Sequence, residues 1–247
     1  MTDFDYSDAP FAIREDIKLA HRDYWQRLAR PGSWWTGAER VAIAAESRRA
    51  RTCAFCTERK NALSPYTQAY AHSNVSNLSA RAVDAVHRVI TDQNRITRTF
   101  VADNHAHGLS EEAYVELTGI TVAVLSIDEF NRALGLQLEP LPEPLNGKPD
   151  EYRPENLTRD TGFVPMLRRD GAIGREQDLW SGERTANVLR ALTLVPDVVR
   201  DWKMIGSAQY LSIEDMGDFG QQAGRSIDRM QMELVAGRVS SVNECFY

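Results

Sequence analysis

Apolar residues recur at helical spacing along most of the chain. They lie three or four residues apart through segments 11–29, 78–91 and 111–134, which is the pattern of helices with one buried face. Ser79 and Ser110 lie at the start of the second and third segments, where a serine hydroxyl can cap the free N–H groups of a helix. No segment alternates apolar and polar residues as a half-buried strand does, so the chain is predicted to be all-α.

A proline-rich segment, residues 138–160, interrupts the helical pattern. Its prolines at 140, 142, 144, 149 and 154 exclude a regular helix or a central strand, so an extended linker is expected. The linker would separate a helical unit at residues 1–137 from a second unit at residues 161–247. Further helices are expected from Thr36 onward and over 185–194, 196–211 and 216–242, with a break in the last near Gly224.

The chain has one Cys-x-x-Cys motif, formed by Cys53 and Cys56. Glu39, Glu46 and Cys53 follow one another at steps of seven residues, so they would share one face if a single helix continues that far. Thr52 is a candidate N-cap for a new helix beginning at Cys53, and a helix N-terminus lowers the pKa of a thiol. Two thiols one turn apart can close a disulfide after one is oxidised. This segment favours thiol redox chemistry, with Glu46 as a candidate proton relay.

Other interpretations of these residues stay open. Glu39 follows Thr36 by three residues, the spacing of a capping box, and this structural role is favoured over catalysis for Glu39. The cysteine pair could be half of a zinc site, which needs two more ligands. Cys245 and five histidines are available for that purpose. His87 lies on the inner stripe of its helix, where a core histidine is the commoner role, and His72 lies in a polar loop.

The composition is that of a globular protein, and it argues against nucleic-acid-binding and membrane-spanning proteins. The chain has 247 residues, of which 43% are hydrophobic and 26% are charged, as in ordinary globular proteins. A net charge of −6 argues against nucleic acid as the main partner. No apolar run reaches membrane-spanning length, and the acidic N-terminus lacks the profile of a signal peptide. Three cysteines, two of them in Cys-x-x-Cys, fit a cytoplasmic location.

The C-terminal residues carry the most specific motif. The stretch from Glu233-Leu234 through Ser240 and Asn243 to Cys245 resembles the signature of the AhpD-like (carboxymuconolactone decarboxylase) superfamily. In that signature a helix begins with Glu-Leu and runs through small residues to Ser, followed by Asn-x-Cys-x-x-Cys and a histidine one turn later. Glu233 precedes Cys245 by the twelve residues typical of the family.

The first half resembles a looser copy of this signature, because Glu39 and Glu46 precede Cys53 by fourteen and seven residues. Segments 114–120 and 130–135 also resemble helices of peroxidase-related members of the superfamily. The resemblance implies an AhpD-like helical bundle, built as a pseudo-duplicated pair of helical units. It also implies thiol-dependent alkylhydroperoxidase or disulfide-reductase activity in antioxidant defence.

The resemblance assigns roles to individual residues. Cys56 would attack the hydroperoxide and Cys53 would resolve the product as a disulfide, while a glutamate and a downstream histidine relay the proton. Lys60 stands where the family has this histidine, so His72 or His87 would have to replace it through space. The expected partners are a small hydroperoxide and a thiol reductant, with no cofactor and no metal.

Glu233 and Cys245 form a second candidate site. The chain stops at Tyr247, where the family pattern continues with a cysteine and a histidine. The site could be a remnant, the chain could be truncated, or the next codon could be a UGA that is read as selenocysteine, since some relatives of the superfamily are selenoproteins. The downstream DNA sequence distinguishes these three explanations.

The sequence also bears on the oligomeric state and leaves two non-enzymatic interpretations open. The helix that contains residues 114–134 is apolar enough to be buried between subunits, which predicts a homo-oligomer, most simply a dimer. A non-catalytic AhpD-like oligomeric scaffold and a zinc-binding structural module are the two alternatives. A redox enzyme would form a reversible disulfide and a zinc module would hold stoichiometric metal, whereas a scaffold would do neither.

Overall fold

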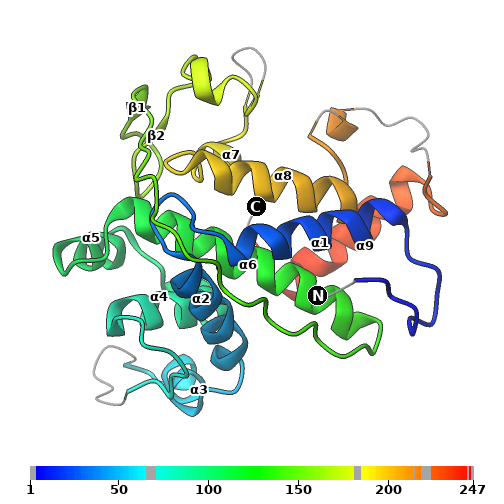
Figure 1. Cartoon of the computed structure of the whole chain (residues 1–247), viewed down its shortest axis with the longest axis horizontal. Helices are drawn as coiled ribbons and strands as arrows, with labels where there is room; N and C mark the ends of the chain where they lie inside the picture. The colour runs from blue at the N-terminus through cyan, green and yellow to red at the C-terminus, as the bar shows by residue number, and fades with distance from the viewer. Residues whose placement is uncertain are drawn as a thin grey trace. The chain divides into compact units, whose positions relative to one another are not determined.

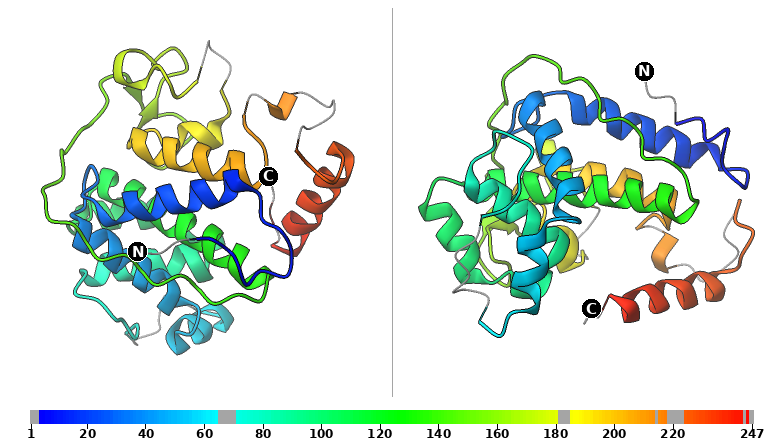
Figure 2. Two further views of the ribbon diagram at one scale, coloured as in Figure 1. Left: turned by 45° about the vertical axis from the view of Figure 1, so that its right-hand side comes forward. Right: turned by 90° about the horizontal axis from the view of Figure 1, so that it is seen from below.

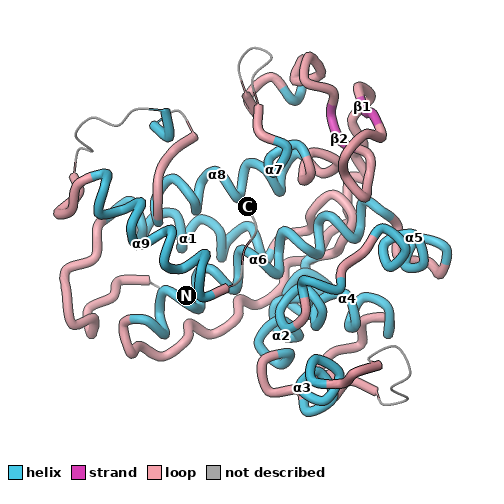
Figure 3. Tube along the Cα trace, turned by 180° about the vertical axis from the view of Figure 1, so that it is seen from behind, coloured by secondary structure: helices cyan, strands magenta, loops and turns pink. Residues whose placement is uncertain are grey.

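The computed structural model describes residues 4–64, 71–180, 185–213, 215–217, 224–243 and 245. The described chain is mostly helical (Figures 1 and 3) and divides into two units, Met1–Ile205 and Gly206–Tyr247. The α-helices are α1 (Glu15–Ala29), α2 (Gly37–Ala50), α3 (Ala54–Asn61), α4 (Ala80–Thr91), α5 (Arg98–Ala106), α6 (Glu111–Ala133), α7 (Asn187–Arg190), α8 (Pro196–Gln209) and α9 (Arg229–Val242). Short 3-10 turns are η2 (Gln93–Arg95), η3 (Gly174–Glu176) and η4 (Asp215–Gly217).

Helices α2, α4 and α6 pack against one another at the centre of the first unit (Figure 2). Their inward residues include Ile43 on α2, Val86 on α4, and Leu117 and Val124 on α6, all of which are fully buried. Helix α1 packs on α2, and α3 packs on α4. Because other helices of the same chain cover α6, its apolar sequence is no longer an argument for a homo-oligomer, which stays a prediction.

Side-chain caps begin the central helices as predicted. The hydroxyls of Ser79 and Ser110 each accept a hydrogen bond from the third N–H group of the helix that follows. Thr36 and Glu39 form a full capping box at the start of α2, in which the Glu39 carboxylate accepts from the Thr36 N–H at 2.9 Å. Glu39 therefore has the structural role that its spacing favoured. Gly135 ends α6 with a φ of 72°, a left-handed conformation that suits glycine.

Several predicted boundaries are wrong. Helix α1 begins at Glu15 rather than at residue 11, and the segment 185–194 is an α-helix only over Asn187–Arg190. The N–H groups of Leu192 and Thr193 bond to carbonyls three residues back rather than four, as in a 3-10 turn. The long pattern over residues 216–242 gives an α-helix only from Arg229 onward, and residues 218–223 lie outside the described part of the chain.

One antiparallel strand pair departs from the all-α expectation. Leu157 lies opposite Leu167 and Thr158 lies opposite Met166 (magenta in Figure 3). Each of these strands, β1 (Leu157–Thr158) and β2 (Met166–Leu167), has two residues. A strand of this length is too short to show alternation in the sequence, because the period of a strand is itself two residues.

The proline-rich segment is extended, as predicted, but it belongs to the first unit. The Trp25 indole N–H donates to the carbonyl of Pro140 at 2.8 Å, and the Leu145 N–H donates to the carbonyl of Ala29 at 2.7 Å. Figure 2 shows this segment passing along α1 and α2. The boundary between the two units falls between Ile205 and Gly206 in the sequence, and residues 138–160 are not a linker between them. None of the described helices is both long and apolar enough to cross a membrane.

The buried His21 predicts acid sensitivity of the fold. Its Nδ1 lies 2.5 Å from the Tyr6 hydroxyl, and the rings of Phe4 and Phe130 contact it at their edges. Burial lowers the pKa of His21 to about 4, whereas an unfolded histidine has a pKa of about 6.5. At a pH between these two pKa values, His21 is therefore protonated in the unfolded chain and neutral in the folded chain. The stabilising contribution of neutral His21 is complete above about pH 6.5 and is lost as the pH falls toward 4.

We expect the free energy of unfolding of the wild type to fall more steeply between pH 6.5 and 4 than that of a His21→Gln variant. Glutamine can still accept a hydrogen bond from Tyr6, but it cannot take up the proton. Denaturant titrations at several pH values measure the two slopes. Parallel slopes would show that His21 does not carry this acid sensitivity.

Candidate functional site

The two cysteines of the Cys-x-x-Cys motif lie at the N-terminus of α3. Cys53 is the N-cap residue of this helix, and Cys56 lies in its first turn. The exposed fractions of Cys53 and Cys56 are 1% and 2%, and both thiols are free rather than joined in a disulfide. The predicted N-cap, Thr52, is therefore wrong by one residue. The helix N-terminus is nevertheless beside the thiols, where its N–H groups favour negative charge.

Glu46 reaches the thiols by a different route from the predicted one. Helix α2 ends at Ala50 and α3 begins at Ala54, so Glu39, Glu46 and Cys53 do not share the face of one continuous helix. The prediction from their seven-residue steps is wrong for this reason. Glu46 is instead connected to the thiols through a histidine on α4.

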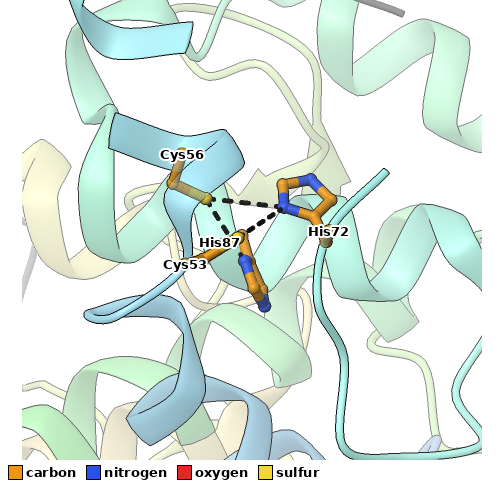
Figure 4. Close-up of side chains that lie close together, drawn as sticks. All are labelled: Cys53, Cys56, His72 and His87. Atoms are coloured by element: carbon orange, nitrogen blue, oxygen red, sulfur yellow. Dashed lines mark hydrogen bonds between the residues drawn. The ribbon is translucent and has the colours of Figure 1, made fainter. Parts of the chain in front are cut away.

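Two histidines from separate segments converge on the thiols (Figure 4). Nδ1 of His72 lies 3.7 Å from Sγ of Cys53 and 3.4 Å from Sγ of Cys56. Nδ1 of His87 lies 3.3 Å from Sγ of Cys56. The four atoms that these side chains present all lie within 4.8 Å of one another. We call these four residues, Cys53, Cys56, His72 and His87, the thiol–imidazole cluster.

A carboxylate orients each imidazole from its other nitrogen. Nε2 of His87 lies 3.2 Å from Oε2 of Glu46, and Nε2 of His72 lies 2.8 Å from Oδ1 of Asp84. An ionised carboxylate can only accept a hydrogen bond, so Nε2 of each ring carries the proton. In the neutral rings, Nδ1, which faces the sulfur atoms, is therefore the nitrogen without a proton.

Each carboxylate is itself fixed by further donors. Glu46 is fully buried and accepts hydrogen bonds from the Val75 N–H at 2.8 Å and from the Ser76 hydroxyl. Asp84 accepts from the guanidinium groups of Arg59 at 2.5 Å and Arg88 at 3.0 Å. These contacts hold the relay groups in one arrangement, because the buried polar atoms of both carboxylates are paired.

The pKa values in the cluster shift toward thiolates paired with protonated imidazoles. Burial by itself raises the pKa of the Cys53 thiol, but hydrogen bonds from the backbone of Cys56 and from His72 lower it to about 5. Burial also raises the pKa of Cys56, yet hydrogen bonds from His72 and His87 bring it below the usual value. Burial lowers the pKa of His72, but its bonds to Asp84 and the two thiols raise it to about 10. The thiolate is the nucleophilic form of a cysteine.

A pocket of about 470 Å³ opens beside Cys56. Its lining includes Arg51 and Lys60, while Cys53 is not among the residues that line it. The Arg51 guanidinium also forms an ion pair with Glu129. Lys60 thus contributes to the wall of the pocket. A small molecule in this pocket would approach Cys56 rather than Cys53.

The structure brings together all five residues of the main candidate site, which are Cys53, Cys56, Glu46, His72 and His87. Asp84 is not among the residues that the sequence predicts for the site. One signal was available, because Asp84 precedes His87 by three residues on a helix that was predicted, and this spacing places both on one face. The contact between Asp84 and His72 depends on how the loop folds back onto α4, and the spacing does not show this.

The second candidate site is not assembled in the described part of the second unit. The Glu233 carboxylate accepts a hydrogen bond from the Tyr210 hydroxyl at 2.6 Å and pairs with Arg229 at 2.7 Å. Cys245 is exposed and lies three residues beyond Val242, the last residue of α9. The helix rises about 14 Å over the nine steps from Glu233 to Val242, which separates the carboxylate from the end that leads to Cys245.

Comparison with known proteins identifies no relative. No protein-family model, no curated protein and no solved structure matches this chain. The similarity to the AhpD-like superfamily therefore rests on the motif residues alone, and the function has to be inferred from the chemistry of the site.

Proposed function

We propose that the chain is a thiol-dependent oxidoreductase that reduces a small hydroperoxide, with Cys56 as the attacking residue. The observation that carries this function is the buried chain of contacts from Cys56 through His87 to Glu46. A nucleophile, a base and a group that orients the base form the general arrangement of an activated nucleophile. The helical fold and the motif residues also lead us to propose an AhpD-like bundle, working in the cytoplasm, where free thiols persist.

The first half-reaction oxidises Cys56. Its thiolate attacks one oxygen of the hydroperoxide, the O–O bond breaks, and Cys56 becomes a sulfenic acid while an alcohol leaves. Nδ1 of His87, 3.3 Å from the sulfur, can take the thiol proton and return it to the leaving oxygen. Glu46 stabilises the positive charge that His87 carries between these two transfers.

The second half-reaction closes a disulfide. The thiolate of Cys53 attacks the Cys56 sulfenic acid, an S–S bond forms, and water leaves. His72, which contacts both sulfur atoms, can supply the proton for the departing hydroxide. The sum is one hydroperoxide and two thiols converted to one alcohol, one water and one disulfide. A thiol reductant then returns two electrons and two protons to the pair.

Cys56 is the proposed attacking residue because of access and contacts. It lines the pocket beside the cluster, whereas Cys53 does not. It also contacts the imidazoles of both His72 and His87. Cys53 is the N-cap of α3 and lies three residues earlier, at the spacing that suits the resolving role.

A trapping experiment tests this assignment. We expect Cys53→Ser to react once with a hydroperoxide and to leave a sulfenic acid on Cys56, because only the resolving step is lost. A dimedone adduct on the peptide that contains Cys56, detected by mass spectrometry, is the readout. The experiment belongs in a Cys245→Ser background, because the exposed Cys245 is open to direct oxidation. An adduct that forms equally well in Cys56→Ser and in Cys53→Ser would assign no attacking role to Cys56.

A further inference from the structure

We propose that Cys53, Cys56, His72 and His87 bind a divalent zinc ion in a tetrahedral site. This metal site does not depend on the proposed peroxide chemistry. It needs only the four donor atoms and the geometry that holds them. The sequence offered the first two ligands as Cys-x-x-Cys and left the other two unassigned.

The distances between donor atoms fit tetrahedral zinc. Zinc–sulfur bonds of about 2.3 Å and zinc–nitrogen bonds of about 2.0–2.1 Å place a sulfur and a nitrogen ligand about 3.6 Å apart. Three of the four sulfur-to-nitrogen distances in the cluster are 3.3, 3.4 and 3.7 Å, and the fourth joins Cys53 to His87. All four donor atoms lie within 4.8 Å of one another, so one ion can reach all of them with small adjustments.

The contacts of the two imidazoles with carboxylates, on the side away from the sulfur atoms, are those of histidines that bind a metal. A histidine ligand usually donates its second ring N–H to a carboxylate, which fixes the tautomer and directs the free nitrogen at the metal. Both rings have such a partner, with Glu46 at 3.2 Å from His87 and Asp84 at 2.8 Å from His72. Asp84 is held in turn by Arg59 and Arg88. A histidine buried only for packing would not need this arrangement twice around one pair of thiols.

Charge and burial fit the same conclusion. Two thiolates neutralise the charge of a divalent ion, and the imidazoles add no charge when the metal replaces the proton at Nδ1. Cys53, Cys56 and His87 are buried, and the side chain of His72 is 9% exposed. Four protein ligands leave no open position for water, as in structural zinc sites. A bound ion would tie the loop that carries His72 to both α3 and α4.

Bound metal and the Cys53–Cys56 disulfide would exclude each other, because both use the two sulfur atoms. Oxidation of the loaded site by one hydroperoxide and two protons would yield the disulfide, an alcohol, water and a released zinc ion. The disulfide has no thiolate left to bind the metal. The loaded form would thus be a reduced state of the dithiol, and a hydroperoxide would convert it to the metal-free disulfide.

Cobalt substitution tests the site directly. We expect the reduced chain to bind one Co²⁺ with the intense visible bands of a tetrahedral ion and with thiolate-to-metal charge transfer, and to exchange it for one Zn²⁺. Cys53→Ser and His72→Gln should each weaken binding by about 100-fold or more, since each removes a ligand. Asp84→Asn, which keeps all four ligands, should weaken it by about 10–100-fold. Cys245→Ser and His107→Gln are matched controls outside the cluster and should bind as the wild type does.

Two outcomes would overturn the metal site. One is a wild type that takes up no more Co²⁺ or Zn²⁺ than His72→Gln does. The other is a weak octahedral spectrum without thiolate charge transfer. Circular dichroism shows whether each variant keeps its helices, and His72→Gln tests the ligand set without altering either cysteine. Peroxide reduction is measured separately on metal-free protein in the presence of a chelator, so that the failure of one function is distinguished from the failure of the other.

Discussion

Cys56→Ser should abolish the turnover of a small organic hydroperoxide by the reduced, metal-free chain. A serine hydroxyl is nearly the same size as the thiol, but it is not ionised at neutral pH and does not attack the peroxide oxygen. The contacts of Cys56 with His72 and His87 can be kept by the hydroxyl, so the fold should be unchanged. The measurement is the rate of hydroperoxide loss with a dithiol as the reductant, compared with the same assay without protein.

Two variants act as controls for this result. Cys245→Ser removes the exposed cysteine outside the cluster and should turn over as the wild type does. Cys53→Ser should still consume hydroperoxide, because the small dithiol can reduce the Cys56 sulfenic acid directly, but it should form no disulfide within the chain. Equal turnover by the wild type, Cys53→Ser and Cys56→Ser would place the reactive centre elsewhere, and the non-catalytic scaffold would become the leading interpretation.

Glu46→Gln should lower the rate of Cys56 oxidation by about 10²–10⁴, the usual size of general acid–base assistance. The amide oxygen can still accept hydrogen bonds from Val75 and Ser76. The amide N–H group then faces Nε2 of His87, which can accept it only in the other tautomer. A neutral amide, however, cannot stabilise a positive charge on His87, whose Nε2 lies 3.2 Å from the carboxylate. Rapid mixing of the reduced protein with hydroperoxide measures the oxidation rate before any reductant is needed.

Glu58→Gln is the matched control for this substitution. Glu58 lies on α3 near the thiols but is exposed, and the same chemical change there should leave the oxidation rate within a factor of about two. Thermal melts of both variants show whether the fold is intact. A Glu46→Gln protein that melts normally and reacts as fast as the wild type would mean that Glu46 takes no part in the proton relay.

Local signals explain which parts of the fold were predictable. Helices α4 and α6 combine a regular apolar stripe with a serine N-cap, so pattern and cap indicate the same start. Strands β1 and β2 have no such signal, because a strand of two residues is too short to show an alternating pattern. The unit boundary at Ile205 was also missed, since the packing of the proline-rich segment on α1 depends on contacts between residues far apart in sequence, such as Trp25 and Pro140.

The candidate site shows the same division between local and distant information. The Cys-x-x-Cys motif and the role of Thr36 and Glu39 in a capping box follow from short spacings, and both are visible in the sequence. The contact of His87 with Cys56 joins residues 31 positions apart, so the sequence could offer the histidine only as a candidate. In the proposed function, His87, which contacts Cys56, takes the part that the resemblance would give to a histidine at the position of Lys60.

The most direct test of the thiol redox centre is a single-turnover titration of the reduced, metal-free chain with one equivalent of hydroperoxide. We expect one alcohol per chain, the loss of two thiols, and a disulfide that joins Cys53 to Cys56 in the peptide map. This reaction should be faster than that of a free cysteine at the same pH by about 10²-fold or more, since a positioned proton relay assists it. Oxidation at the rate of free cysteine, with no Cys53–Cys56 disulfide, would contradict the proposed function.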